Sequence, residues 1–534
     1  MTRIKKLLVL GWLCLQSLTA QAGIDAAMLK PLAGDDPDAR VEAVGRIAAL
    51  ADADAARLLL ALKNDALYAL PDGAVVIVDG ATAFDPVTGK SGPVPEGADG
   101  IVVNNRLRGA VEGALAGLAL FSPDVGLRRA AALELQSAFD PAQLPLVRQA
   151  LANEGDATIE SILRLLVARA NLRSPDAAVR MAAVTGLAGS GDASLLPLLR
   201  AMLAKNADGA YAEPDAAVRV AIHASVKAIA SRIAWIAFAG KLFYGLSLGS
   251  VLLLAALGLA ITFGLMGIIN MAHGELLMIG AYTCYVCQLL FRKFLPGAVD
   301  AYLIAAVPAA FLVAGAVGVA LERTVIRWLY GRPLETLLAT WGISLMLMQA
   351  VRTVFGAQNV EVANPSWMSG GVTVLGSLVL SYNRIVIIFF ALFVVLAVWL
   401  ILNKTRLGLF VRAVTQNRRM AGCVGVSSAK IDMLTFGLGS GIAGLGGVAL
   451  SQLGNVGPDL GQSYIVDSFM VVVLGGVGQL AGSVIAALGL GEVNKFLEPV
   501  AGAVLAKIAI LVFIIIFIQR RPQGLFALKG RSVD

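Results

Sequence analysis

The sequence predicts an all-α protein in two parts: an exported α-helical domain with a small β insertion, followed by a polytopic bundle of transmembrane helices. Three observations lead to this fold class. Of the 534 residues, 58% are hydrophobic and 15% are charged, whereas soluble globular chains carry about 25% charged residues. The apolar excess begins at residue 233, after roughly 200 residues of ordinary soluble composition. The N-terminus has the features of an export signal.

The first 22 residues have the three regions of a cleaved signal peptide. Basic residues at the start are followed by an apolar core at 7–18, which is too short to span a bilayer stably. A small-x-small sequence then ends at Ala22. We therefore predict a signal peptide at 1–22, with a retained membrane anchor as the alternative.

Residues 23–232 contain a weakly repeated signal for the start of a helix. Each copy has a polar residue suited to an N-cap, a proline suited to the first helical position, and an aspartate that complements the helix dipole. The last three copies lie about 40 to 50 residues apart, which is typical of stacked helix pairs. The pattern resembles HEAT-like repeats. The four copies are Asp36-Pro37-Asp38, Ser122-Pro123-Asp124, Ser174-Pro175-Asp176 and Glu213-Pro214-Asp215.

A segment inside this domain has the pattern of short β-strands. Ala74–Val78 and Ile101–Val103 are rich in β-branched residues and are separated by a Gly/Pro-rich stretch. We predict a small β insertion here. For the whole exported domain, docking of a partner is the functional hypothesis and a structural cap is the alternative.

Residues 233–534 contain apolar stretches of about 20 residues, the length that a hydrocarbon core of about 30 Å requires. Loops 323–332 and 404–430 are rich in Arg and Lys, which predicts that both are cytoplasmic. Counting back from the first loop places the N-terminal domain outside, in agreement with the export signal. The predicted spans are 236–262, 264–290, 300–322, 334–352, 383–403, 432–453, 466–490 and 500–518.

The basic C-terminal tail conflicts with eight complete passes. Such passes would leave the Arg and Lys residues between 520 and 531 outside, against the positive-inside rule. Either one glycine-rich stretch is broken or re-entrant, or the rule fails for this tail. The pair Gly475-Gly476, with Gly478 and Gly482, is the candidate for a break.

Polar side chains within the apolar stretches are the candidate functional residues. Asn270, His273 and Glu275 stand close together, and polar groups at membrane depth usually face the bundle interior or a water-lined path. On a helix, Asn270 and His273 would lie one turn apart, with Glu275 pointing elsewhere. Thr340 and Gln349 are further candidates for a solute path. A hydrogen bond that holds two helices together is the alternative for each residue.

These residues do not predict an enzyme. A metal site normally needs three or more protein ligands, and the only other histidine, His223, lies in the exported domain. Neither a zinc-protease H-E-x-x-H motif nor a complete nucleotide-binding motif occurs in the sequence. We expect no catalytic residue, no metal and no cofactor.

Residues 264–275, Gly-Leu-Met-Gly-Ile-Ile-Asn-Met-Ala-His-Gly-Glu, closely resemble the signature of the branched-chain amino-acid and urea type of ABC permease. Residues 335–342, 355–359 and 364–367 resemble the urea branch. The resemblance spans 236–529, and the exported extension is similar to that of some urea permeases. It implies the membrane-spanning permease subunit of an ATP-driven ABC importer for urea, a protein of nitrogen uptake.

Residues 406–426 are similar to the coupling segment of that family, in which a short cytoplasmic helix docks on the ATPase. The resemblance implies coupling roles for Arg412, Asn417 and Arg418, with Gly425 at the end of the helix. The positive-inside rule alone would also explain the arginines.

The resemblance further implies a location and partners. The chain would lie in the bacterial inner membrane with its N-terminal domain in the periplasm. Its partners would be two ABC ATPase subunits, which hydrolyse ATP, a second permease subunit and a periplasmic or extracellular solute-binding protein, with no nucleic acid.

Two other functions stay open at this point. One is a permease of the same family for branched-chain amino acids or short amides, although a zwitterion favours charged groups along the path and only Glu275 and Glu335 are candidates. The other is a membrane-anchored helical-repeat receptor or interaction protein. A mere anchor would not need polar groups at membrane depth or a coupling-type loop.

Overall fold

A computed structural model describes residues 24–526 apart from 51, 81, 138, 140–142, 207, 208, 376 and 377. The predicted signal peptide lies outside the described residues. The chain divides into two compact units, Met1–Ile233 and Ala234–Asp534. The division falls inside one long helix, α11 (Ala216–Met266).

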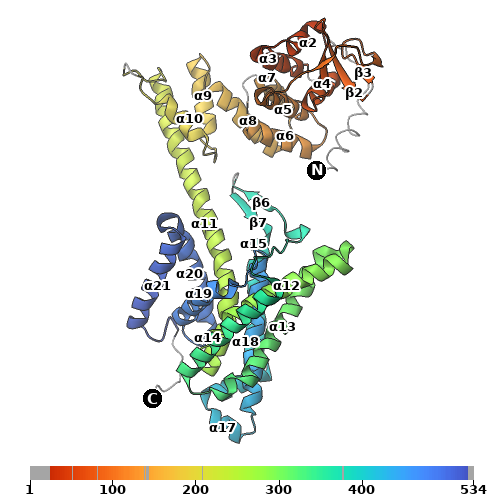
Figure 1. Cartoon of the computed structure of the whole chain (residues 1–534). Coiled ribbons are helices and arrows are strands. Elements are labelled where there is room, and N and C mark those ends of the chain that lie inside the picture. The colour runs from red at the N-terminus through yellow and green to blue at the C-terminus, as the bar shows by residue number, and fades with distance from the viewer. Residues whose placement is uncertain are drawn as a thin grey trace. The chain divides into compact units, whose positions relative to one another are not determined.

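The first unit is mainly helical (Figure 1). Three groups of buried apolar side chains, which include Leu58, Leu163 and Val184 respectively, follow one another along its described part. That the array is HEAT-like stays a prediction. The helices are α2 (Ala26–Ala33), α3 (Pro37–Ala48), α4 (Ala53–Lys63), α5 (Asn105–Ala119), α6 (Val125–Ser137), α7 (Leu144–Asn153), α8 (Ala157–Asn171), α9 (Ala177–Leu187), α10 (Leu195–Met202) and the start of α11.

A small antiparallel sheet follows α4, with the strand order β4-β3-β2-β1-β5. The predicted strand at Ala74–Val78 corresponds to β2. The predicted strand at Ile101–Val103 is wrong, because pairing ends at Gly100 and Ile101 instead buries its side chain in the core. The strands are β1 (Leu67–Ala69), β2 (Val75–Asp79), β3 (Thr82–Phe84), β4 (Ser91–Pro93) and β5 (Asp99–Gly100).

The later Pro-Asp helix starts are built around an arginine five residues after the proline. Arg180 donates hydrogen bonds from Nη1 to the carbonyl oxygens of Ser174 and Pro175, both at 2.9 Å. The sequence pattern predicted that the residue before the proline, Ser174, caps α9. The N-cap is instead Asp176, the residue after the proline. Only α3 begins as expected, with Asp36 as its cap. Two further arginines make the same pair of bonds, Arg128 and Arg219.

Two of these arginines also hold a glutamate that lies just before a later helix, α8 or α11. Arg180 holds Glu213 through two hydrogen bonds of 2.9 and 2.7 Å, and the Glu213 side chain is only 2% exposed. Arg128 holds Glu154 in the same way. In both cases the hydrogen bond from the arginine lowers the pKa of the glutamate.

Acid is expected to weaken the first unit through these pairs. Because the pKa of Glu213 falls below its ordinary value of 4.5 on folding, its pair contributes full stability above that value and loses the contribution as pH falls through the lowered pKa. Glu213→Gln should therefore lower the thermal unfolding midpoint by a few degrees at pH 7 and by progressively less as the pH falls below 4.5. Thermal unfolding of the full chain in detergent at a series of pH values measures this, and a decrease that does not shrink in acid would contradict it.

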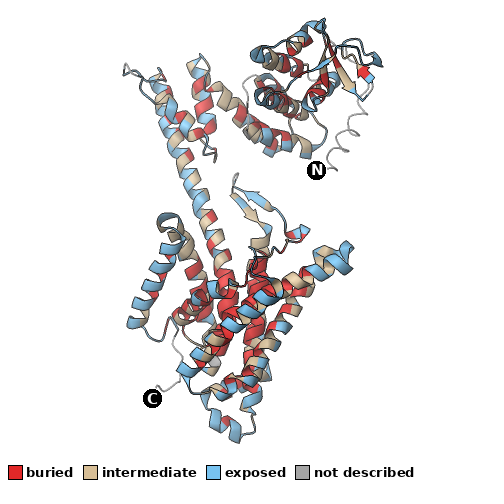
Figure 2. Ribbon diagram, viewed as in Figure 1, coloured by how far each residue is buried: buried red, intermediate tan, exposed pale blue. Residues whose placement is uncertain are grey.

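The second unit is a bundle of apolar helices. Among the described residues, eight helices are long and apolar enough to cross a membrane, while α19 is shorter, with 16 residues. Among these spans, the apolar stretches of α11 and α18 are the most buried, and those of α15 and α21 are the least buried (Figure 2). The helices after α11 are α12 (His273–Phe294), α13 (Tyr302–Thr324), α14 (Pro333–Phe355), α15 (Tyr382–Lys404), α16 (Arg406–Gln416), α17 (Arg418–Cys423), α18 (Ser428–Ser451), α19 (Leu460–Gly475), α20 (Leu480–Ala501) and α21 (Ala503–Arg520).

Short elements join these helices. A two-stranded antiparallel hairpin precedes α15. The 3₁₀ helices are η2 (Pro296–Ala301), η3 (Ile326–Trp328) and η4 (Ser366–Met368), and the strands are β6 (Gly371–Val374) and β7 (Leu378–Ser381). Glycine allows α12 and α18 to approach closely, since a methyl group on Gly447 would overlap the carbonyl oxygen of Leu277.

The predicted span 466–490 is two helices. α19 ends at Gly475, and the chain turns into α20 through Gly476 (φ 98°) and Gly478 (φ 81°). Both backbone conformations favour glycine. The predicted break at Gly475-Gly476 is therefore confirmed. When α19 is counted, the described second unit has nine apolar helices, an odd number, where eight spans were predicted.

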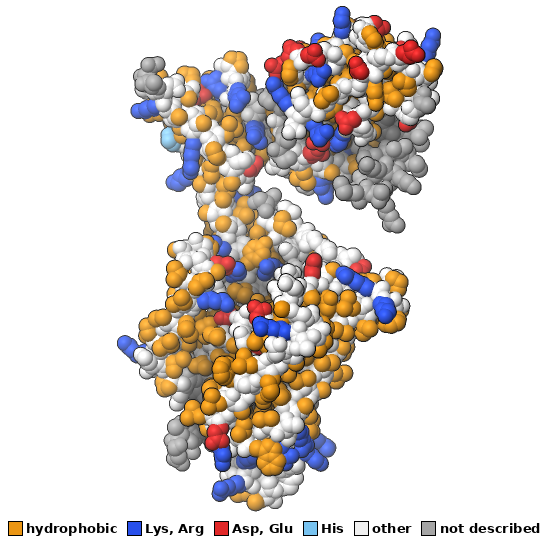
Figure 3. Space-filling view, viewed as in Figure 1, with side chains coloured by type: hydrophobic (Ala, Val, Ile, Leu, Met, Phe, Trp, Pro, Cys, Tyr) orange, Lys and Arg blue, Asp and Glu red, His pale blue; other side chains and the backbone are white. Residues whose placement is uncertain are grey.

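The break also explains the position of the basic tail. The amide of Leu525 donates to the carbonyl oxygen of Leu474 at 2.9 Å, so the segment after α21 lies beside the end of α19. The α19–α20 turn contacts Gly264 near the end of α11, and the end of α11 shares a cavity with Tyr330 and Arg418. The basic loops and the start of the tail thus lie at one end of the unit, where Figure 3 shows Lys and Arg side chains. We call this the basic end.

Candidate functional site

The connection between α11 and α12 is a partly buried turn. α11 ends at Met266, Gly267 adopts a left-handed conformation (φ 68°), and α12 begins at His273. Asn270 lies fully buried in this turn, where its Oδ1 accepts a hydrogen bond from the amide of Ala272 at 3.0 Å. The expectation that Asn270 and His273 share one helix is wrong, because the side-chain amide replaces a helical backbone bond here.

His273 joins α12 to α11. Its side chain is completely buried, and Nε2 lies 2.8 Å from the carbonyl oxygen of Ala255, so the tautomer with hydrogen on Nε2 donates to that oxygen. Over the part of the chain that the structure describes, no group of three or more His, Cys, Asp or Glu side chains is arranged to hold a metal ion. His273 therefore holds the start of α12 against α11, and it is not among the residues that line the cavity described next.

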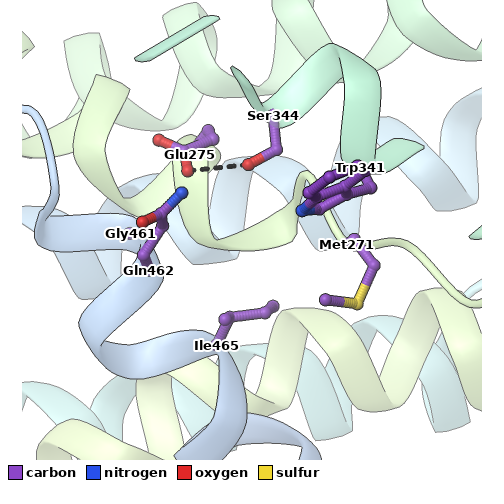
Figure 4. A pocket seen from close by; sticks show the side chains of 7 residues that line it. All are labelled: Met271, Glu275, Trp341, Ser344, Gly461, Gln462 and Ile465. Carbon is purple, nitrogen blue, oxygen red and sulfur yellow. Dashed lines mark hydrogen bonds between the residues drawn. The ribbon is translucent and has the colours of Figure 1, made fainter. Parts of the chain in front are cut away.

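A cavity of about 260 Å³ lies at the first turn of α12 and is also bordered by α14 and the first turns of α19 (Figure 4). Glu275 is 1% exposed, and its Oε1 accepts a hydrogen bond from Ser344 Oγ at 2.9 Å. Its Oε2 has no hydrogen-bond partner among the described residues. Because buried polar atoms are normally paired, this oxygen is suited to a donor from a bound molecule.

The walls of this cavity differ in chemistry. Polar side chains of Glu275, Ser344 and Gln462 lie on one side, and the remaining side chains are apolar or aromatic (Figure 4). The described lining residues include neither Lys nor Arg. The full lining is Met271, Glu275, Trp341, Ser344, Gly461, Gln462 and Ile465.

Thr340 and Gln349 occupy opposite environments on α14. Thr340 is fully buried, and its Oγ1 accepts a hydrogen bond from the amide of Met271 at 3.1 Å and donates to the carbonyl oxygen of Thr336 at 2.8 Å. Gln349 is exposed, on a face that also exposes Met346. The structure therefore brings Asn270, His273, Glu275 and Thr340 together around one turn, with only Glu275 lining the cavity, and places Gln349 apart from them.

Sequence reasoning did not single out Ser344, Trp341 or Gln462. Ser344 follows Thr340 by one helical turn on the same face, and this spacing could have indicated it. Gln462 comes from α19, far along the chain, and no local pattern connects it with Glu275.

The predicted coupling segment forms α16 and α17 at the basic end (Figure 1). Asn417 caps α17, with its Oδ1 accepting a hydrogen bond from the amide of Met420 at 2.9 Å. Gly425 follows in a left-handed conformation (φ 89°). Arg412 bonds back to the backbone at the end of α15 at 3.1 Å. Met420 and Val424 remain 60% and 72% exposed, so α17 presents apolar side chains outward.

Arg418 has its partners within the chain. Its guanidinium group forms an ion pair with Asp432 of α18 and lies 4.2 Å from the ring centroid of Tyr330. Arg418 therefore connects α17 both to α18 and to the loop before α14.

Comparisons with known proteins agree with this architecture. A family model described as the permease component of branched-chain amino acid transport systems matches residues 241–519. The high-affinity branched-chain amino acid transport permease BraD of Pseudomonas aeruginosa is 31% identical over 291 residues, which cover 53% of this chain and 94% of BraD. The high-affinity branched-chain amino acid transport permease LivH of Escherichia coli is 27% identical over 297 residues, which cover 54% of this chain and 95% of LivH. No solved structure matches the chain.

A bundle of apolar helices with a partly polar cavity between them is typical of a polytopic membrane permease. The chain belongs to the family of permease components of branched-chain amino acid transport systems. It is thus an inner-membrane permease component of an ABC transporter and not an enzyme; permeases of this family work with ATPases and a binding protein. This membership argues against a membrane-anchored receptor.

Proposed function

We propose that this chain forms the membrane path of an ATP-driven importer for urea. The observation that carries the proposal is a small cavity lined by Glu275, whose buried Oε2 has no hydrogen-bond partner among the described residues. Urea is compact and offers N–H donors together with a carbonyl acceptor. Glu275 can accept from its N–H groups, and the amide of Gln462 can donate to its carbonyl oxygen. Leaving such a buried acceptor unpaired costs about 1–3 kcal/mol, which binding of a donor would recover.

The charge of the cavity supports a neutral solute. A zwitterionic amino acid brings a carboxylate as well as an ammonium group, and a buried charge without a partner is costly. The side chains that line the described cavity offer one carboxylate and no cation. Urea needs no counter-charge, so the lining suits it better.

A branched-chain amino acid is the second candidate, since the relatives carry that name. Met271, Trp341 and Ile465 give the cavity an apolar wall that suits an aliphatic side chain. Glu275 would then accept from the ammonium group, and the solute carboxylate would meet the first turn of α19 at Gly461, where helix N-termini attract anions.

The partners and the orientation follow the same proposal. Two ATPase subunits would dock at α17, beside a second permease subunit, and a binding protein would deliver solute from the other side. The positive-inside rule would place the basic end in the cytoplasm. With nine passes, the exported N-terminal unit would then be periplasmic.

Uptake of labelled urea tests the solute. Cells that lack this chain should lose high-affinity urea uptake, and the intact gene should restore it. Unlabelled leucine should not compete with the restored uptake of labelled urea, whereas unlabelled acetamide can compete. Unaltered urea uptake together with lost amino-acid uptake would reject urea and favour the second candidate.

A further inference from the structure

A second cavity, of about 440 Å³, lies at the basic end. Both cavities border the same two segments. On α14, Thr336 lines the second cavity and Ser344 lines the first; on the α11–α12 turn, Gly267 lines the second and Met271 the first. The lining of the second cavity is Met266, Gly267, Ile268, Leu329, Tyr330, Gly331, Arg332, Pro333, Thr336, Val414, Thr415 and Arg418.

Thr340 lies between the two cavities. Thr336, Thr340 and Ser344 are spaced four residues apart, so their hydroxyl groups follow one face of α14. Thr340 Oγ1 accepts the hydrogen bond from the amide of Met271, and it lies 3.5 Å from the carbonyl oxygen of Ile269. The turn thus contacts α14 at Thr340, between the residues of α14 that line the two cavities.

We propose that the two cavities are successive compartments of a single solute path and that the contact of Thr340 with Met271 is the barrier between them. This inference rests on the proposed transport function and adds the route. The face of α14 suits a polar solute, because Thr336 and Thr340 each donate to a backbone carbonyl of their own helix, at 2.8 Å in both cases. Their oxygens can therefore accept N–H groups from a passing solute.

The surroundings of the barrier allow it to open and connect it to the coupling segment. The turn is held by few backbone hydrogen bonds, such as the one from the amide of Gly267 to the carbonyl oxygen of Phe263 at 3.0 Å, and Gly267 gives its backbone a conformation other residues rarely adopt. Val414 and Arg418 of α16 and α17 form part of the second cavity's wall. Because Arg418 also holds Asp432 and Tyr330, a displacement of α17 would change that wall and the start of α14 together.

Cysteine labelling in membrane vesicles that contain the complete transporter tests the route. Thr336→Cys, Thr340→Cys and Ser344→Cys are small changes, made in a Cys423→Ser background because Cys423 is exposed. With a charged, impermeant thiol reagent, we expect Thr336→Cys to react only from the basic end and Ser344→Cys only from the opposite face. Thr340→Cys should react from neither side without ATP. Leu338→Cys, on the exposed apolar face of α14, sets the background.

Two results would overturn the route: reaction of Thr336→Cys and Ser344→Cys from the same side, or reaction of Thr340→Cys in the resting state. The solute is tested separately in the same vesicles. Protection of Ser344→Cys by urea supports the proposed function. Opposite-sided labelling with protection by leucine but not by urea keeps the route and rejects urea.

Discussion

Replacement of Glu275 by glutamine is expected to lower solute uptake about 10- to 100-fold. The glutamine oxygen can still accept from Ser344 Oγ, but the unpaired acceptor becomes an N–H donor that faces the N–H groups of the solute. The loss of a hydrogen bond to a charged group amounts to about 1.5–3 kcal/mol, which corresponds to that range of affinity. The initial rate of labelled solute uptake, divided by the amount of the chain in the membrane, measures the effect.

Gln349→Ala is the matched control on α14. Gln349 is polar and lies in an apolar helix like the predicted path residues, yet its side chain is exposed and away from the cavity. We expect its uptake rate to stay within about twofold of the wild type, since substitutions at exposed positions usually have small effects. Wild-type uptake by Glu275→Gln, or an equal loss in both variants, would contradict the assignment of the cavity.

Replacement of Gly425 by proline is expected to abolish solute-stimulated ATP hydrolysis by the assembled transporter. Gly425 has φ 89°, whereas proline fixes φ near −65°. The change also removes the amide that donates to Gly422 at 3.1 Å. The turn that leads from α17 to α18 would be rebuilt, and Met420 and Val424 would leave the position in which they can dock.

Assembly and stimulation are measured on the same purified complex. Gly422→Ala is the control, because Gly422 lies within α17 with open space around it and alanine favours a helix. This variant should keep its stimulation. Normal assembly and normal stimulation in Gly425→Pro would show that the segment after α17 does not couple the permease to its ATPase.

The sequence indicated the membrane helices well, because a span is decided by the length and polarity of its own residues. It also indicated the break at Gly475-Gly476, since the basic tail would obey the positive-inside rule only with an odd number of passes. It did not locate the turn before His273. The run 264–290 is apolar enough for a helix throughout, and the turn depends on Gly267 and on a side-chain bond from Asn270.

The cavity was only partly predictable. Glu275 could be found because a carboxyl group at membrane depth is costly. Gln349 was placed on the path from its polarity alone, although nine residues after Thr340 correspond to a rotation of roughly 180° about the helix. Gln462 could not be found, because its place beside Glu275 depends on how α19 packs against α12. The helix starts of the first unit show the same limit, since Glu213, which accepts two hydrogen bonds from Arg180, lies 33 residues further along the chain.

The most direct test of the central claim is ATP-driven solute accumulation in proteoliposomes that contain this chain with its partner subunits and binding protein. Labelled urea and labelled leucine are compared side by side, each with the wild type and with Glu275→Gln. We expect urea to accumulate, leucine not to accumulate, and Glu275→Gln to remove most of the urea accumulation. Accumulation of leucine alone, or of urea to the same extent with Glu275→Gln, would contradict it.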